Sequence, residues 1–150
     1  KGTDVLFCIH ETRYKDYAAY AAAVPTVNPR WKNQILKGIA PKDRTEDHPV
    51  VIVSWEDAQA FCAWLSQKEA KRYRLPTDEE WSYAVGIGRD EKRKKGDTPA
   101  TVMRVKEYPW GTNWPPSKGC ENYGDESYKA TLGEQKYLTG YDDGYATTAQ

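Results

Sequence analysis

The side chains best suited to metal or redox chemistry are few in this sequence and lie far apart. Cysteine occurs at Cys8, Cys62 and Cys120, and no two of them have the C-x-x-C spacing of a zinc ribbon or a thioredoxin-type site. An odd count argues against a complete disulfide framework, so we expect free buried thiols, with one disulfide as the alternative. His10 and His48 are the only histidines. A zinc or iron site built from histidines would therefore need ligands from outside this chain.

Composition excludes two classes of partner. The chain has 22 Lys and Arg against 22 Asp and Glu, without the basic excess of a nucleic-acid binder. It has no apolar run of about 18 residues, so we expect no membrane insertion. The first residues lack the layout of a signal peptide, and the compartment stays open. The 6 Trp and 11 Tyr, against 2 Phe, predict aromatic anchors of core and loops, or a binding surface.

The hydrophobic pattern of the N-terminal third predicts a strand, a helix and a long loop. Residues 5–9 (VLFCI) have the apolar run of a short buried strand. Thr12 is the expected N-cap of a helix that Pro25 ends. The apolar face of this helix carries Tyr17, Tyr20, Ala21 and Val24 at helical spacing. Residues 25–49 have little periodicity and predict an ordered loop that Trp31 holds in place.

The central third predicts a second strand and two capped helices. Residues 50–53 (VVIV) predict the strand. Ser54 and Asp57 form an approximate capping box for a helix that runs to about Ala70. Its buried face is expected to hold Ala58, Phe61, Cys62 and Leu65.

The next elements follow Pro76. Thr77 and Glu80 form a full capping box, and the helix that it starts ends at Gly86 and Gly88. The apolar face of this helix is expected at Trp81, Ala84 and Val85. Residues 89–97 (RDEKRKKGD) predict a solvated loop, and turn formers predict loops from Tyr108 onward. The pattern indicates an α+β domain without regular βαβ alternation.

Several motifs in a fixed order carry a family resemblance. Residues 48–58 read HPVVIVSWEDA, residues 61–65 read FCAWL, and residues 73–84 read YRLPTDEEWSYA. Residues 11–20 (ETRYKDYAAY) precede this block, and residues 108–111 (YPWG), 122–123 (NY) and 143–145 (DGY) follow it. Together they resemble the formylglycine-generating-enzyme (sulfatase-modifying-factor) family. The wording of the first helix is closest to a bacterial subgroup found in multidomain proteins, some of them fused to kinases.

The resemblance implies a fold. It predicts a single domain over residues 1–150 with the loop-rich, C-type-lectin-like α+β fold of the family, incomplete at the C-terminus. The matched residues are expected to serve the scaffold as caps, strand ends and aromatic anchors, with Trp55, Trp81 and Trp110 stacked in the core. This structural signature comprises His48, Ser54, Trp55, Asp57, Arg74, Pro76, Thr77, Glu80, Trp81 and Trp110.

The resemblance also implies an activity, which this chain is not expected to perform alone. The family's oxidase converts a sulfatase cysteine to formylglycine with molecular oxygen, using copper held by a cysteine pair near its C-terminus. The three cysteines here do not match those positions, so no catalytic residue is predicted and copper is expected only if such a pair lies beyond this chain. Three roles remain open: part of an oxidase, a non-catalytic binding or sensor module, or a structural domain of a larger assembly. In each case the missing part of the domain, or another protein chain, is expected to cover an exposed apolar patch, and a peptide or protein is the expected ligand.

A calcium site is the one functional feature that the resemblance places on this chain. By motif it would use the side chains of Asn122 and Asp143 and the carbonyls of Tyr123 and Tyr145. Calcium takes six to eight oxygen ligands, so water or further carbonyls would complete the shell. The alternative is an Asx turn at Asn122 and a tight turn at residues 143–144.

Overall fold

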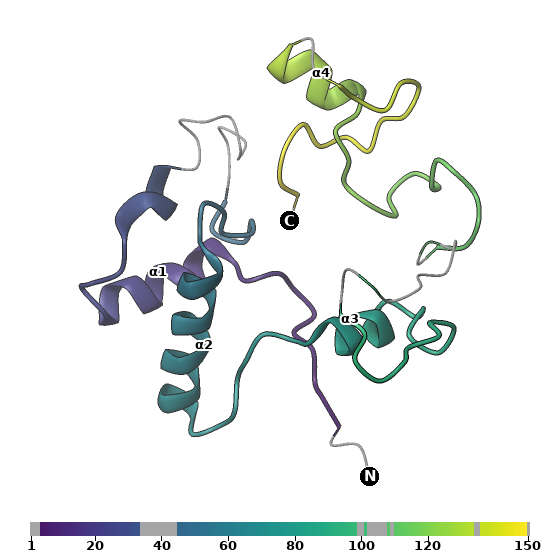
Figure 1. Ribbon diagram of the computed structural model, residues 1–150. Coiled ribbons are helices and arrows are strands. Elements are labelled where there is room, and N and C mark those ends of the chain that lie inside the picture. The colour runs from purple at the N-terminus through teal and green to yellow at the C-terminus, as the bar shows by residue number, and fades with distance from the viewer. Residues whose placement is uncertain are drawn as a thin grey trace. The chain divides into compact units, whose positions relative to one another are not determined.

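The chain folds as two compact units. The computed structural model describes residues 4–33, 45–98, 101, 108, 110–133 and 136–149. Unit 1 consists of Lys1–Cys8 and Pro76–Pro116, and unit 2 consists of Ile9–Leu75 and Ser117–Gln150. Unit 2 holds α1 (Tyr14–Ala23), the 3-10 helix η1 (Pro29–Asn33), α2 (Trp55–Glu69) and α4 (Glu126–Leu132), while unit 1 holds α3 (Asp78–Ala84) (Figure 1).

An aromatic cluster forms the core of unit 2, between α1, η1 and α2. Tyr17, Tyr20 and Trp31 are buried, and Phe61 and Trp64 of α2 pack against them. The Tyr17 ring lies 5.4 Å from that of Trp31 and 5.8 Å from that of Phe61, within the range in which aromatic pairs stabilise each other. The predicted apolar face of the first helix and the anchoring role of Trp31 are thus confirmed.

The start of α1 is capped by a distant turn. Its N-cap residue is Arg13, whose side chain makes no capping hydrogen bond, so the prediction of Thr12 is wrong by one residue. The first amides donate to carbonyls of the 45–49 turn, Tyr14 N–H to His48 (2.8 Å) and Lys15 N–H to Glu46 (3.1 Å). The buried ring of His48 in turn accepts the Thr45 N–H at Nδ1 (3.1 Å). The first amides of a helix lack partners within the helix and can bond to any suitably placed acceptor. In α1 these acceptors are backbone carbonyls of the 45–49 turn.

The two predicted capping boxes are both present. Ser54 Oγ accepts from Asp57 N–H, and the Asp57 carboxylate accepts from Ser54 N–H. Thr77 and Glu80 make the same pair of bonds at α3. The α2 helix ends at Ala70, which has a left-handed conformation (φ 51°), close to the predicted end. Capping is read correctly from sequence because its partners lie three residues apart.

The two predicted strands are not formed. In the part of the chain that the structure describes, β pairing is limited to isolated bridges between Arg13 and Pro49 and between Tyr108 and Gly111. Residues 5–9 are exposed instead of buried, with Leu6 at 95%, and the 50–53 segment contains Ile52 at φ 60°. A strand needs a continuous ladder of pairing. Among the described residues, the 50–53 segment makes a single backbone–backbone bond of this kind, from Val50 N–H to the Thr12 carbonyl (2.8 Å), and no such bond involves residues 5–9.

In unit 1 a polar network replaces the predicted apolar face of α3. Ser82 is the buried residue of this helix, while Trp81 is 56% exposed. The Arg93 guanidinium donates to Asp78 (2.8 Å), Ser82 (3.1 Å) and Glu91 (2.6 Å), and the Asp78 carboxylate raises the pKa of Arg93 most. Because Glu91 is buried within this network, the 89–97 segment is not simply a solvated loop.

The expected tryptophan core is also corrected. Trp55, the first residue of α2, is 63% exposed and is not among the residues of the aromatic cluster. Trp110 is half-buried and stacks on Tyr108 with ring centroids 4.8 Å apart and planes 3° apart. These side chains anchor local turns and surfaces rather than one common core.

The cysteines are free thiols, as expected, but none of the three is fully buried. Cys8 and Cys120 are exposed, and Cys62 is half-buried on α2. Burial raises the pKa of the Cys62 thiol, which favours the protonated form. Among the described helices, none is both long enough and apolar enough to cross a membrane.

Candidate functional site

The four residues predicted for calcium lie in the C-terminal part of unit 2, in loops that surround α4. This helix was predicted as loop, because its seven residues have too little periodicity to identify it. Its N-cap is Asp125, a residue that the sequence analysis did not single out. A signal was present, since Asp is a preferred N-cap and Glu126 follows it in the first turn.

Asp125 is the centre of the loop cluster. It is 0% exposed, and both carboxylate oxygens accept backbone hydrogen bonds. Oδ1 accepts from Ser127 N–H (2.9 Å) and Tyr128 N–H (3.3 Å), and Oδ2 accepts from Asp143 N–H (2.6 Å). A buried carboxylate is tolerated when such donors replace its water. Asp125 therefore caps α4 and also fixes the position of a loop 18 residues further along the chain.

Asp143 extends this arrangement to the other predicted residues. Its Oδ2 accepts from Tyr123 N–H (2.6 Å) and its Oδ1 from Tyr145 N–H (2.8 Å). Asn122 Nδ2 donates to the carbonyl of Thr147 (2.5 Å). The structure thus brings Tyr123, Asp143 and Tyr145 into direct contact and ties Asn122 to the same returning loop.

Neighbouring carboxylates hold the rest of the loop. Asp142 Oδ1 accepts from Ser127 Oγ (2.6 Å) and Gly144 N–H (3.0 Å), and these two bonds lower the pKa of Asp142, that of Ser127 most. Glu126 Oε1 accepts from Gly140 N–H (3.0 Å). A tight turn at residues 143–144 was the predicted alternative to calcium, and Gly144 has the positive φ (90°) that such a turn uses.

The donor types of this cluster fit a hard cation. Carboxylate, amide and carbonyl oxygens are the ligands of calcium. Although each oxygen of Asp143 accepts one backbone N–H, a carboxylate oxygen has a second lone pair. Asn122 uses its nitrogen toward Thr147, which leaves its amide oxygen as an acceptor.

The residues present do not fit copper(I). This ion requires soft thiolates that converge on one site. All three cysteines are free, and Cys62 favours its protonated form. Over the residues that the structure describes, no group of three or more His, Cys, Asp or Glu side chains could hold a metal ion.

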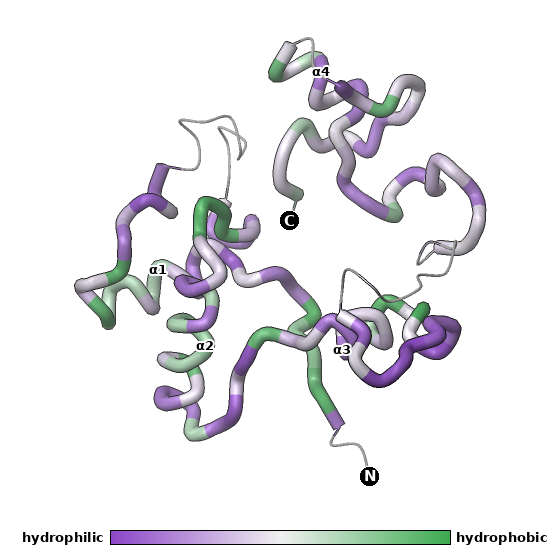
Figure 2. The backbone as a smooth tube through the Cα atoms, in the orientation of Figure 1, coloured by the Kyte–Doolittle hydropathy of each residue, from purple (hydrophilic) through white to green (hydrophobic). Residues whose placement is uncertain are grey.

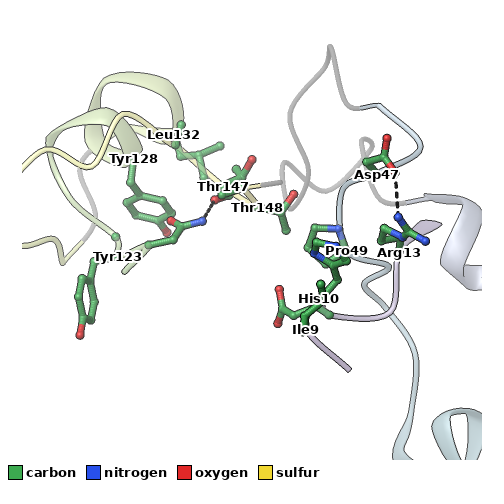
Figure 3. A pocket seen from close by; sticks show the side chains of 15 residues that line it. Ile9, His10, Arg13, Asp47, Pro49, Tyr123, Tyr128, Leu132, Thr147 and Thr148 are labelled. Carbon is green, nitrogen blue, oxygen red and sulfur yellow. Dashed lines mark hydrogen bonds and ion pairs between the residues drawn. The ribbon is translucent and has the colours of Figure 1, made fainter. Parts of the chain in front are cut away.

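A pocket of about 790 Å³ in unit 2 includes two of the predicted residues, Asn122 and Tyr123. One part of its lining comes from the segments 9–13 and 47–49, including His10, Arg13 and Pro49, and the other from the segments 122–132 and 146–149, including Tyr123 and Tyr128 (Figure 3). Within it, the hydroxyl oxygens of Thr147 and Thr148 are buried and have no hydrogen-bond partner among the described residues. Asp47 is one of the lining residues of this pocket. Its pKa is lowered, mainly by a hydrogen bond from Lys15.

Comparison with known proteins identifies the family of the chain. The family model described as sulfatase-modifying factor enzyme 1-like domain matches residues 7–149. The chain belongs to this family. It therefore shares a domain type with formylglycine-generating enzymes, as the motif order predicted.

Relatives in this family include both active and inactive members by name. The chain is 32% identical over 95 residues to the inactive C-alpha-formylglycine-generating enzyme 2 of Bos taurus (63% of this chain, 25% of the relative). It is 30% identical over 103 residues to the formylglycine-generating enzyme of Bos taurus (69% and 21%). It is 36% identical over 86 residues to that of Thermomonospora curvata (57% and 22%).

The chain thus spans at most a quarter of the length of these relatives. No solved structure shows a significant match to it. Family membership is established, while the activity of the relatives does not transfer to this chain by similarity alone.

Proposed function

We propose that this chain forms the scaffold portion of a formylglycine-generating-enzyme-family domain and does not by itself oxidise a cysteine. The observation that carries the proposal is the state of its thiols. Cys8, Cys62 and Cys120 are all free, and the described residues offer no cluster of metal donors around them. The oxidase of this family holds its copper with a pair of cysteines, and copper(I) favours such soft thiolate ligands.

The arrangement of the signature residues supports a scaffold role. Four of them form the capping boxes of α2 and α3: Ser54, Asp57, Thr77 and Glu80. These hydrogen bonds satisfy the first amides of α2 and α3, which is a structural role. His48 belongs to the turn whose carbonyls accept the first amides of α1. A relative named as inactive shows that the family includes members without the activity.

The direct test is an activity assay. The purified chain is incubated with copper(I), oxygen, a thiol reductant and a peptide carrying the sulfatase cysteine motif, and aldehyde formation is followed by mass spectrometry. We expect no conversion above the rate of a Cys8, Cys62 and Cys120 to Ser triple variant. Conversion by the chain that is lost in this variant would overturn the proposal.

We further propose that the loop cluster around Asp143 binds calcium through Asn122, Tyr123, Asp143 and Tyr145. The shared hydrogen bonds of Asp143 and the hard oxygen donors support it. A ligand that binds only the folded state raises the melting temperature with its concentration. Addition of Ca²⁺ to chelator-treated protein should therefore raise Tm, and Asp143→Asn should abolish the rise while Asp90→Asn, at an exposed position in unit 1, retains it. An unchanged Tm in the wild type would refute the site.

A second candidate function is that of a binding module, which a different observation favours. Tyr108 and Trp114 are exposed, and their ring centroids lie 5.3 Å apart, while Tyr108 also stacks on Trp110 (4.8 Å). Such aromatic surfaces are common at interfaces. If these rings serve binding, Trp114→Ala leaves Tm unchanged, whereas a purely structural role predicts a clear loss of stability.

A further inference from the structure

A groove in unit 1 has the features of a peptide-docking surface. It has a volume of about 630 Å³ and lies between the N-terminal segment and α3. We call it the α3 groove. Its lining residues are Asp4, Val5, Phe7, Thr77, Glu79, Glu80, Tyr83 and Ala84. All of them belong to unit 1, so the groove is formed within a single compact unit.

The floor of the groove is apolar and accessible. Phe7 packs against Trp81 with ring centroids 6.4 Å apart, and Tyr83 is 53% exposed. Figure 2 shows the hydrophobic colour concentrated along the N-terminal stretch beside α3. Contiguous exposed apolar surface of this kind marks an interaction site more often than single exposed residues do.

The backbone that borders the groove is also available for binding. Residues 4–8 adopt neither helix nor strand, and no backbone–backbone hydrogen bond involves them in the described part of the chain. Main-chain N–H and C=O groups need partners, and an added strand supplies them. Peptides that dock by strand addition use this kind of segment, with side-chain pockets giving specificity.

The charge of the rim selects the ligand. Asp4 and Glu79 are the acidic residues of the groove without an ion-pair partner among the described residues. Glu80 accepts a hydrogen bond from the Thr77 amide, and none of the described residues that line the groove is Lys or Arg. Complementary charge across an interface steers association and discriminates against wrong partners.

We propose that the α3 groove binds an extended segment of a separate polypeptide with alternating apolar and basic side chains. The segment pairs with the backbone of residues 4–8, places its apolar side chains against Phe7 and Tyr83, and directs its cations toward Asp4 and Glu79. A second copy of this chain is a poorer occupant, because its own apolar run at residues 5–9 has no basic residue and follows another Asp4. The proposal concerns recognition and is independent of the oxidase question.

The first test uses two capped synthetic peptides that differ only in charge. One alternates valine with lysine, and the other alternates valine with glutamate; binding to the purified chain is measured by isothermal titration calorimetry at low salt. We expect the lysine peptide to bind at least about tenfold more tightly. A lysine peptide N-methylated at every backbone nitrogen should lose most of this binding, because it has no N–H group left with which to pair as a strand. Equal binding of all three peptides, or none, would overturn the proposal.

The second test reverses the rim charge. Glu79→Lys should weaken the lysine peptide about tenfold and strengthen the glutamate peptide, a gain that unfolding cannot produce. Asp90→Lys introduces the same charge at an exposed position of unit 1 outside the groove and should change neither affinity. If both substitutions act alike, the effect is one of net charge and the groove is not the site. Concentration-dependent dimerisation by light scattering that Glu79→Lys prevents would assign the groove to a second copy instead.

Discussion

Removal of the Asp125 carboxylate should destabilise the loops around α4. The side chain is fully buried and accepts three backbone N–H groups at 2.6 to 3.3 Å. A hydrogen bond to a charged group contributes about 1.5–3 kcal/mol, and an orphaned buried donor costs about 1–3 kcal/mol. Because the three bonds share one carboxylate, their losses are not additive, and we expect Asp125→Ala to cost about 3–6 kcal/mol.

The asparagine variant separates the two oxygens. Asp125→Asn keeps an oxygen for Ser127 and Tyr128 but places an NH₂ group opposite the Asp143 N–H, so the cap survives and the long-range bond is lost. We expect about half the cost of the alanine variant, in the range of about 1.5–3 kcal/mol. Glu121→Gln, at an exposed position, serves as the control and should cost less than about 0.5 kcal/mol.

The assay combines urea unfolding with hydrogen exchange. Two compact units need not unfold together, so amide exchange at residues 127, 128 and 143 reports on the cluster itself. In Asp125→Asn the amide of residue 143 should lose protection, while those of residues 127 and 128 keep it. The reasoning is refuted if Asp125→Ala is as stable as the control, or if all three amides exchange alike in both variants.

Three further outcomes follow from other contacts. Burial raises the pKa of Tyr17 to about 12. The unfolded chain therefore loses this proton at lower pH than the folded chain, and the free energy of unfolding falls as pH rises from about 10 to about 12. In urea titrations Tyr17→Phe should reduce this loss of stability, whereas Tyr83→Phe, at an exposed site, should leave it unchanged. Ser54→Ala removes a cap and should cost about 1 kcal/mol, measured by thermal unfolding; an unchanged Tm would show that α2 does not need it. Arg93→Met should lower Tm because it leaves the buried Glu91 without its cation; a variant as stable as wild type would contradict the assigned role of this network.

The parts of the fold that sequence predicts well are the local ones. The capping boxes at Ser54 and Thr77 depend on side chains three residues away, and helix periodicity places Tyr17 and Tyr20 on the buried face. The strands at residues 5–9 and 50–53 were predicted from apolar content alone. Pairing depends on segments distant in sequence, which a local pattern does not contain.

The candidate site shows the same division. Family resemblance pointed to Asn122 and Asp143, and the structure places both in one loop cluster. The same reasoning missed Asp125, because its decisive contact is with an amide 18 residues away. It also predicted that Trp55, a residue of the family motif, lies in the core, whereas this side chain is exposed. A motif identifies the family to which a chain belongs more readily than it predicts whether a given side chain is buried.

The most direct test of a scaffold without oxidative chemistry is an anaerobic copper(I) titration with parallel thiol counting. The purified, reduced chain is titrated against a competing copper(I) chelator while free thiols are quantified with a chromogenic disulfide reagent under denaturing and native conditions. The account predicts three titratable thiols on unfolding, no copper retained against the chelator, and the same thiol count with and without copper. One copper bound per chain, with two thiols protected by it, would contradict the account and assign the chain an oxidase-type metal centre.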